Sequence, residues 1–167
     1  MNLYILRHGI AVEPGTSGYE QDADRPLTAE GERKLLQITE AMAALGLAFD
    51  LILSSPYVRA RQTAEIVAAA FAAGKKLNFS DSLACGGDPR KLIEHLRHLQ
   101  PRAENILLVG HEPYLSGLIS LLVFGEPTLA VVMKKGGLCK LSTNSLKHGR
   151  CAALEWLLTP KQMALMA

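Results

Sequence analysis

Three short apolar runs, each followed at once by polar residues or glycine, constrain the fold of this chain more than any other feature. They are residues 3–6 (LYIL), 51–53 (LIL) and 106–109 (ILLV). Runs of this length and composition are typical of strands that are buried on both faces of a parallel sheet. Longer segments with helical spacing lie between them. We therefore predict an α/β fold, a three-layer sandwich in which helices cover both faces of a mostly parallel central sheet.

Helical spacing and end signals predict helices over residues 28–45, 55–73, 89–99 and 113–122. Thr28 is a suitable N-cap for the first helix. For the second helix we expect Ser55 as N-cap and Pro56 as the first helical residue. Two late strands are expected at 138–141 and 152–158. The segment 11–25 has no hydrophobic period and is expected to be an irregular loop beside the end of the first strand.

Composition excludes several classes of protein. Lysine and arginine number 18 and aspartate and glutamate 16, and a net charge of +2 gives no electrostatic case for a nucleic-acid or membrane partner. The length of 167 residues fits one domain spanning residues 1–167.

The three cysteines form no C-x-x-C pair, which favours a reducing compartment. Arg7 interrupts the N-terminus too early for a signal peptide, and residues 115–124 fall short of the ~20 apolar residues of a membrane span. We expect a cytoplasmic protein.

Basic and imidazole side chains follow each of the three apolar runs. Arg7 and His8 follow the first run, Arg59 lies in the first turn of the helix after the second, and His111 comes directly after the third. In open α/β sheets, ligands bind beyond the carboxyl ends of the strands. We therefore expect these four side chains to converge on one edge of the sheet.

These residue types indicate chemistry on a phosphoryl group. Arginine is permanently charged and can donate two parallel hydrogen bonds to phosphate oxygens. Two helices begin at the same edge and add free N–H groups and partial positive charge. A neutral imidazole is a competent nucleophile, and nearby cations disfavour its protonation. We expect one histidine of this cluster to be deprotonated and reactive near neutral pH.

Four segments, in order along the chain, resemble the signature segments of the histidine phosphatase superfamily, which has the phosphoglycerate-mutase-like fold. They are LRHG at 6–9, RPLT at 25–28 with Gly31 following, SPYVRARQT at 55–63 and VGHEP at 109–113. The chain is most similar to the short bacterial SixA-type phosphohistidine phosphatases. The resemblance implies a cofactor-independent hydrolase that dephosphorylates a protein in signal transduction.

The resemblance also implies roles for individual residues. His8 would be the nucleophile and would become transiently phosphorylated, while Arg7, Arg59 and His111 would hold the phosphoryl oxygens. Arg25 matches a family arginine that can reach the same pocket, although a solvated residue before a helix cap is an equal alternative. No metal is implied.

One departure from the family pattern bears on the substrate. Larger superfamily members carry a general-acid glutamate between the second and third helices, whereas residues 82–88 contain none. The leaving group of a phosphoramidate departs more easily than an alkoxide, which needs protonation by a general acid. The missing acid therefore favours a phosphohistidine substrate. Asp88 could substitute as an acid, or it could simply precede or cap the next helix. The short loops suggest an open pocket that a phosphohistidine-bearing protein, a phosphotransfer domain or a phosphocarrier, could enter.

Two other functions remain open at this stage, and the sequence does not give the oligomeric state. The same site could hydrolyse a small phosphomonoester, or it could be a phosphate-binding module without catalysis. His95 and His98 are three residues apart, but no further ligand stands at a metal-like spacing beside them. Thr63 shares a helix face with Arg59 and is expected to pack there.

Overall fold

The computed structural model describes residues 1–99 and 102–167 and contains one six-stranded sheet in the order β3-β2-β4-β1-β5-β6. The strands are β1 (Asn2–Arg7), β2 (Leu51–Ser54), β3 (Leu77–Phe79), β4 (Asn105–Gly110), β5 (Leu138–Ser142) and β6 (Ala153–Leu158). The helices are α1 (Ala29–Ala44), α2 (Val58–Ala70), α3 (Pro89–Arg97), α4 (Tyr114–Phe124) and α5 (Pro160–Met163).

The sheet is mostly parallel, as the apolar runs predict. Strands β3, β2, β4 and β1 run parallel to one another, β5 pairs antiparallel with β1, and β6 pairs antiparallel with β5. Arg7 at the end of β1 lies opposite Gly110 at the end of β4, and Ser54 at the end of β2 lies opposite Val109. This register brings the residues that follow all three strands to one level at one edge of the sheet.

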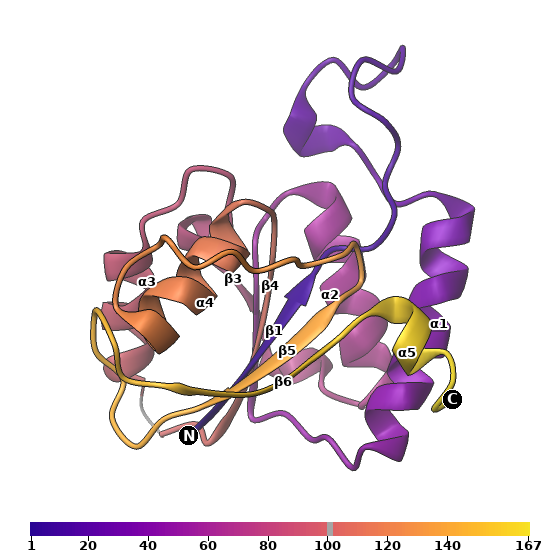
Figure 1. The fold of residues 1–167 in the computed structure, drawn as a ribbon. Coiled ribbons are helices and arrows are strands. Elements are labelled where there is room, and N and C mark those ends of the chain that lie inside the picture. Colours follow the sequence, from indigo (N-terminus) through magenta and orange to yellow (C-terminus); the bar gives the residue numbers. More distant parts are fainter. Residues whose placement is uncertain (100–101) are drawn as a thin grey trace.

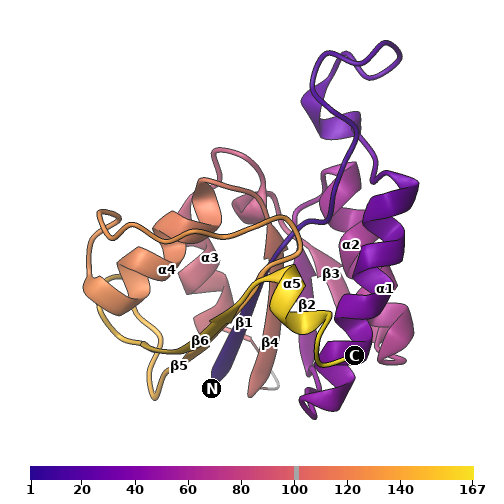
Figure 2. The same cartoon turned by 45° about the vertical axis from the view of Figure 1, so that its right-hand side comes forward.

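Helices cover both faces of the sheet, so the three-layer sandwich is confirmed (Figures 1 and 2). Helices α1, α2 and α5 lie on one face and α3 and α4 on the other. Each face has its own buried apolar cluster, which follows from the alternation of side chains along the strands: Leu3 and Ile5 belong to one cluster, Tyr4 and Leu6 to the other.

The segment between β1 and α1 projects away from the sheet (Figure 1). At its base, Ala11 and Leu27 form an isolated antiparallel bridge, and its far part contains a short 3-10 turn at Asp22–Asp24. Thr28 caps α1 as predicted, since its side chain accepts a hydrogen bond from the Gly31 amide. A Cβ atom at Gly31 would lie 2.1 Å from the Ile10 carbonyl oxygen, so glycine allows α1 to start against the loop.

The predicted start of the second helix was wrong. Helix α2 begins at Val58 with Tyr57 as N-cap, and not with Ser55 as cap and Pro56 as first residue. The Ser55 amide is still bonded to the Val109 carbonyl of the sheet, at 2.9 Å, so the backbone turns into the helix only afterwards. The helix ends at Ala70 and not near Ala73, and Ala72 has a φ of 49°, which no α-helix accommodates.

Two short elements were not predicted, although Thr159, Pro160 and Gln162 form a sequence signal for the start of the second. Strand β3 has three residues at the sheet edge and is only partly buried, so it lacks an apolar run. Helix α5 has four residues, and a capping box between Thr159 and Gln162 starts it. Within the described residues, no helix has both the length and the apolar character needed to cross a membrane.

Candidate active site

His8 follows β1 directly, and its hydrogen bonds fix which ring nitrogen carries a proton. Its side chain is 6% exposed, and Nδ1 lies 2.7 Å from the carbonyl oxygen of Gly9. A carbonyl oxygen can only accept a hydrogen bond, so Nδ1 must carry the hydrogen. In the neutral ring, Nε2 then holds a lone pair. The Arg59 Nε–H group donates toward this nitrogen over 3.3 Å.

Arg59 links helix α2 to the projecting loop. It is 3% exposed, and its guanidinium donates to the backbone carbonyl of Asp22 at 2.6 Å and to Oδ2 of Asp22 at 2.8 Å. The same Asp22 carboxylate accepts hydrogen bonds from Arg25, at 2.9 Å from Nε and 2.6 Å from Nη2. Arg25 is 9% exposed, so the structure rejects its interpretation as a solvated residue. Arg25 and Arg59 therefore share one acidic partner at the site.

Asp22 is a residue of the site that the sequence analysis did not identify. It lies in a segment without hydrophobic period, and its partner Arg59 is 37 residues away along the chain. The only signal was its position three residues before Arg25, a spacing that allows a local ion pair. Partial burial alone would raise the pKa of Asp22, but hydrogen bonds from Arg25 and Arg59 hold it below its ordinary value.

Thr63 does more than pack. Its hydroxyl accepts a hydrogen bond from the Gly9 amide at 3.1 Å and donates to the Arg59 carbonyl at 2.7 Å. Because the side chain is fully buried, these bonds have no competition from water. Thr63 thus ties the peptide next to His8 to the helix that carries Arg59. Its position one helical turn after Arg59 was the signal that sequence reasoning undervalued.

His111, which follows β4, completes the cluster. Its ring centroid lies 5.1 Å from that of His8, and its Nε2 lies 2.8 Å from the Ser55 hydroxyl. The same hydroxyl accepts a hydrogen bond from the Tyr57 amide at 3.3 Å, so Ser55 joins His111 to the turn that leads into α2 although it is not the N-cap of that helix. Nδ1 of His111 is buried and has no hydrogen-bond partner within the described chain. A buried imidazole nitrogen without a partner is available to a bound ligand.

Arg7 lies between the strand ends and the turn before β5. Its Nη1 donates to the Met133 carbonyl at 2.7 Å, while its buried Nε has no partner in residues 1–99 and 102–167. Burial, partly opposed by the nearby Glu112 carboxylate, lowers the pKa of Arg7. An arginine remains charged even so. The four side chains that the sequence assigned to one edge therefore surround one cavity of about 300 Å³.

Comparisons with known proteins identify the family. The family model described as histidine phosphatase superfamily (branch 1) matches residues 3–84. An uncharacterized protein of Picosynechococcus sp. is 36% identical over 148 residues, which cover 88% of each chain. The chain belongs to the histidine phosphatase superfamily.

Solved structures of several phosphatases are similar to this chain over nearly its whole length. The protein histidine phosphatase SixA complexed with tungstate has a TM-score of 0.82 at 21% identity, over 96% of this chain and 98% of its own. A protein of Agrobacterium tumefaciens, provisionally named phosphohistidine phosphatase SixA, has a TM-score of 0.75 at 26% identity, over 95% and 97%. A mycobacterial glucosyl-3-phosphoglycerate phosphatase has a TM-score of 0.71 at 18% identity, over 96% and 98%. Phosphatases of proteins and of small molecules thus share this scaffold.

Both histidines of this superfamily member are neutral over the physiological pH range. Burial is the main cause for each, ahead of the neighbouring arginines that the sequence analysis emphasised. Burial lowers the pKa of His8, the hydrogen bond to the Gly9 carbonyl partly opposes this, and His111, Arg59 and Arg7 add to the lowering, so that the pKa is about 3. Burial followed by the charge of Arg59 lowers the pKa of His111 to about 4.

The cavity of this histidine phosphatase superfamily protein contains acidic as well as basic groups. Its lining residues are Arg7, His8, Glu13, Pro14, Asp22, Arg25, Arg59, Cys85, His111, Glu112 and Lys135. Asp88 does not line it. The Asp88 carboxylate instead accepts a hydrogen bond from the Arg90 amide at 2.8 Å and caps α3. Of the two roles considered for Asp88, the structure supports the cap.

The residues that the sequence analysis set aside as metal ligands lie apart from the site. His95 and His98 are exposed on α3. Among residues 1–99 and 102–167, no three His, Cys, Asp or Glu side chains are grouped as metal ligands.

Proposed function

We propose that residues 1–167 form one catalytic domain that hydrolyses phosphohistidine on a protein through a phosphorylated His8. The observation that carries this proposal is the hydrogen bond from His8 Nδ1 to the Gly9 carbonyl. It leaves the lone pair on Nε2, next to Arg59, in a cavity that three arginines line. A neutral, oriented imidazole beside fixed cations meets the requirements of a nucleophile toward phosphorus.

The reaction proceeds in two displacements. In the first, His8 Nε2 attacks phosphorus and the P–N bond of the substrate breaks. The substrate imidazole keeps the electron pair of that bond and leaves neutral when its other ring nitrogen is protonated. In the second displacement, water attacks phosphorus and the bond to His8 Nε2 breaks. His8 returns to the neutral form with its proton on Nδ1, and dihydrogen phosphate leaves.

Arg7, Arg59 and His111 hold the oxygens of the phosphoryl group in this proposal. Support comes from Nε of Arg7 and Nδ1 of His111, which are buried without partners in the described part of the chain. Phosphoryl oxygens would accept their hydrogen bonds if His111 carries its proton on Nδ1 and accepts from the Ser55 hydroxyl. Arg25, on the loop between β1 and α1, contributes a further positive charge to the cavity. Such preorganised donors act mainly on the charge that develops in the transition state.

The substrate in this proposal is a phosphohistidine-bearing protein, either a phosphotransfer domain or a phosphocarrier. Asp88 is engaged in capping α3, so the segment where larger family members carry a general acid supplies none here. A phosphoramidate needs no such acid when its leaving imidazole is already protonated. The chemistry of the site therefore suits phosphohistidine without further groups.

A small phosphomonoester is the second candidate, because three carboxylates line the cavity. Glu13, Asp22 and Glu112 reach it from segments outside residues 82–88. A carboxylic acid that protonates an alkoxide leaving group contributes about 10²–10⁴-fold to the rate. This candidate keeps His8 as nucleophile and changes only the leaving group.

The test is phosphate release from a phosphorylated histidine phosphotransfer domain. The intact protein, His8→Ala and the control His148→Ala, which changes an exposed histidine in a loop, are compared. We expect release by the intact protein and by His148→Ala only, together with a base-stable, acid-labile phosphoenzyme that His8→Ala lacks. Release by His8→Ala would refute the mechanism. Hydrolysis of glucose 6-phosphate with no release from the phosphoprotein would establish the second candidate.

A further inference from the structure

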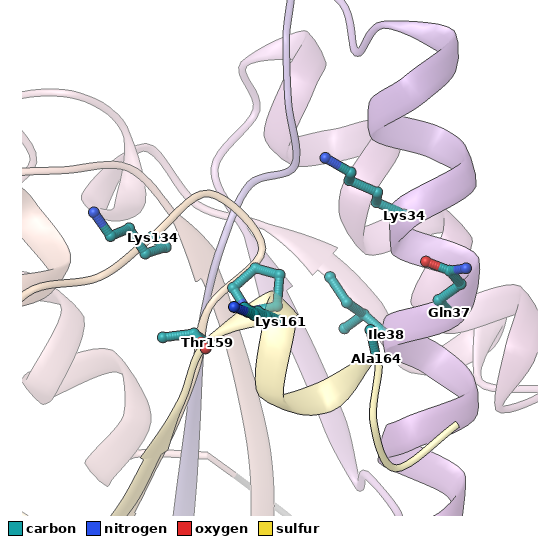
Figure 3. A pocket seen from close by; sticks show the side chains of 8 residues that line it. Lys34, Gln37, Ile38, Lys134, Thr159, Lys161 and Ala164 are labelled. Carbon is teal, nitrogen blue, oxygen red and sulfur yellow. The ribbon is translucent and has the colours of Figure 1, made fainter.

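A second cavity lies on the α1 and α5 side of the molecule, outside the active site. Its volume is about 520 Å³, within the range of ~300–1,000 Å³ that small-molecule sites occupy. Its lining residues are Lys34, Gln37, Ile38, Lys134, Thr159, Pro160, Lys161 and Ala164. Figure 3 shows Lys34 on α1 and Lys134 on the turn before β5 at opposite sides, with Lys161 of α5 between them.

The floor of this cavity is apolar and its rim is basic. Ile38 is 3% exposed and, with Pro160 and Ala164, forms the apolar part. The three lysines come from three separate segments, and no lining residue is acidic. Lys34 is paired with Glu30 at 2.6 Å, but among residues 1–99 and 102–167 neither Lys134 nor Lys161 has an ion pair. Lys134 and Lys161 are therefore two cations without a carboxylate partner at the rim of an apolar surface.

We propose that this cavity binds a small amphipathic anion, a molecule with an apolar body and one carboxylate, sulfonate or phosphate group. The apolar body lies on Ile38 and Pro160, where burial removes apolar surface from water. The anionic group is held by Lys134 and Lys161. A neutral apolar molecule would leave both ammonium groups uncompensated, and a fully polar anion would gain nothing from the floor. Charge complementarity and the size of the cavity together favour this class of ligand.

The cavity and the active site share one wall, the turn 134–137. The Gly136 amide donates to the carbonyl oxygens of Arg7 and His8, at 3.1 and 3.0 Å. On its other side, a Cβ atom at Gly136 would lie 2.8 Å from Ile38 Cδ1 and 3.4 Å from Pro160 Cγ. The neighbouring Lys135 lines the active-site cavity, while Lys134 lines the second one. A ligand on this turn therefore contacts the segment that supports the backbone of Arg7 and His8.

The test uses naphthalene-2-sulfonate, which has an apolar body and one sulfonate, with 2-naphthol as its uncharged counterpart. Calorimetric titration of the full chain should give a Kd of about 0.1–1 mM for the sulfonate, as expected for a ligand of this size. We expect 2-naphthol to bind about tenfold more weakly. Lys134→Glu and Lys161→Glu should each weaken sulfonate binding at least about fivefold, and Ala164→Trp, which fills the cavity from an exposed position, should abolish it.

Two controls separate this cavity from other surfaces. Lys91→Glu changes an exposed lysine on α3 across the sheet and should leave the Kd unchanged. Saturating tungstate, an oxyanion that we expect to occupy the active site, should leave a binding stoichiometry of one for the sulfonate. Loss of sulfonate binding in tungstate would place the ligand in the active site and overturn the proposal. Equal affinity in the intact protein and both lysine variants would overturn it as well. Binding at the second cavity does not depend on the proposed catalytic function.

Discussion

The hydroxyl of Thr63 holds the peptide that positions His8, and its removal gives a sharp test of this arrangement. In Thr63→Val the side chain keeps its shape but loses the acceptor for the Gly9 amide, which lies 3.1 Å away. That amide then has no partner in a fully buried environment. The Arg59 carbonyl is less affected, because it also faces the helical backbone one turn later.

The expected loss follows from the desolvation of one buried donor. An unsatisfied buried amide costs about 1–3 kcal/mol, so the free energy of unfolding should fall by that amount. Urea denaturation at constant m-value measures this loss. Since Gly9 also supplies the carbonyl that orients His8, we expect kcat to fall as well, with little change in KM. Phosphate release from a phosphorylated phosphotransfer domain measures that effect.

Two comparisons show whether the hydrogen bond is responsible. Thr63→Ser keeps the hydroxyl and should retain most of the kcat. Thr39→Val removes a hydroxyl from α1 that donates to the Leu36 carbonyl at 2.7 Å and should leave kcat unchanged. If Thr63→Val matched the intact protein in both stability and kcat, the proposed link between Thr63 and His8 would be wrong. Equal losses in Thr63→Val and Thr63→Ser would point to packing in place of the hydroxyl.

Three further predictions concern charge at the active site. The pKa values of His8 (about 3) and His111 (about 4) lie below the unfolded value of 6.5, so below pH 6.5 the unfolded chain binds more protons than the folded protein. Stability therefore decreases as the pH is lowered, and urea titrations should show the free energy of unfolding fall by about 2 kcal/mol per histidine between pH 6.5 and pH 4.5. Asp22→Asn removes an anion that competes for Arg59, so calorimetry should show tungstate binding about 3–10-fold more tightly; weaker binding would mean that Asp22 mainly positions the arginine. Cys85 is accessible at the active-site cavity, so iodoacetamide should abolish phosphate release, slowly because partial desolvation of the thiol raises its pKa, and tungstate should protect the protein; loss of phosphate release in Cys85→Ser at the same rate would contradict this.

Sequence reasoning located the histidines and Arg59 because each follows an element with a strong pattern. A buried parallel strand reads as an uninterrupted apolar run, and the ends of such strands meet at one edge of the sheet. Arg7, His8 and His111 therefore come together for a topological reason. Arg59 lies on the first turn of a helix whose existence, though not its first residue, was predictable.

Contacts made by the irregular loop were beyond the same reasoning. Asp22 pairs with Arg59 only because the 3-10 turn of the projecting loop lies against helix α2, and no periodicity encodes that path. The helix start predicted at Ser55 was wrong for a similar reason: the Ser55 amide is bonded to the Val109 carbonyl of the sheet, and its hydroxyl contacts His111, which is 56 residues away. Helix-cap preferences are read from neighbouring residues and do not include a hydrogen-bond partner so distant in sequence.

The projecting segment between β1 and α1 divides the site into a fixed half and an adjustable half. His8 continues a strand with neighbours on both sides, whereas Asp22 and Arg25 stand on a loop secured at its base by the Ala11–Leu27 bridge. Insertions or substitutions in that loop can therefore reshape the entrance while His8, the proposed nucleophile, keeps its place. Selection can change which molecule enters without moving His8.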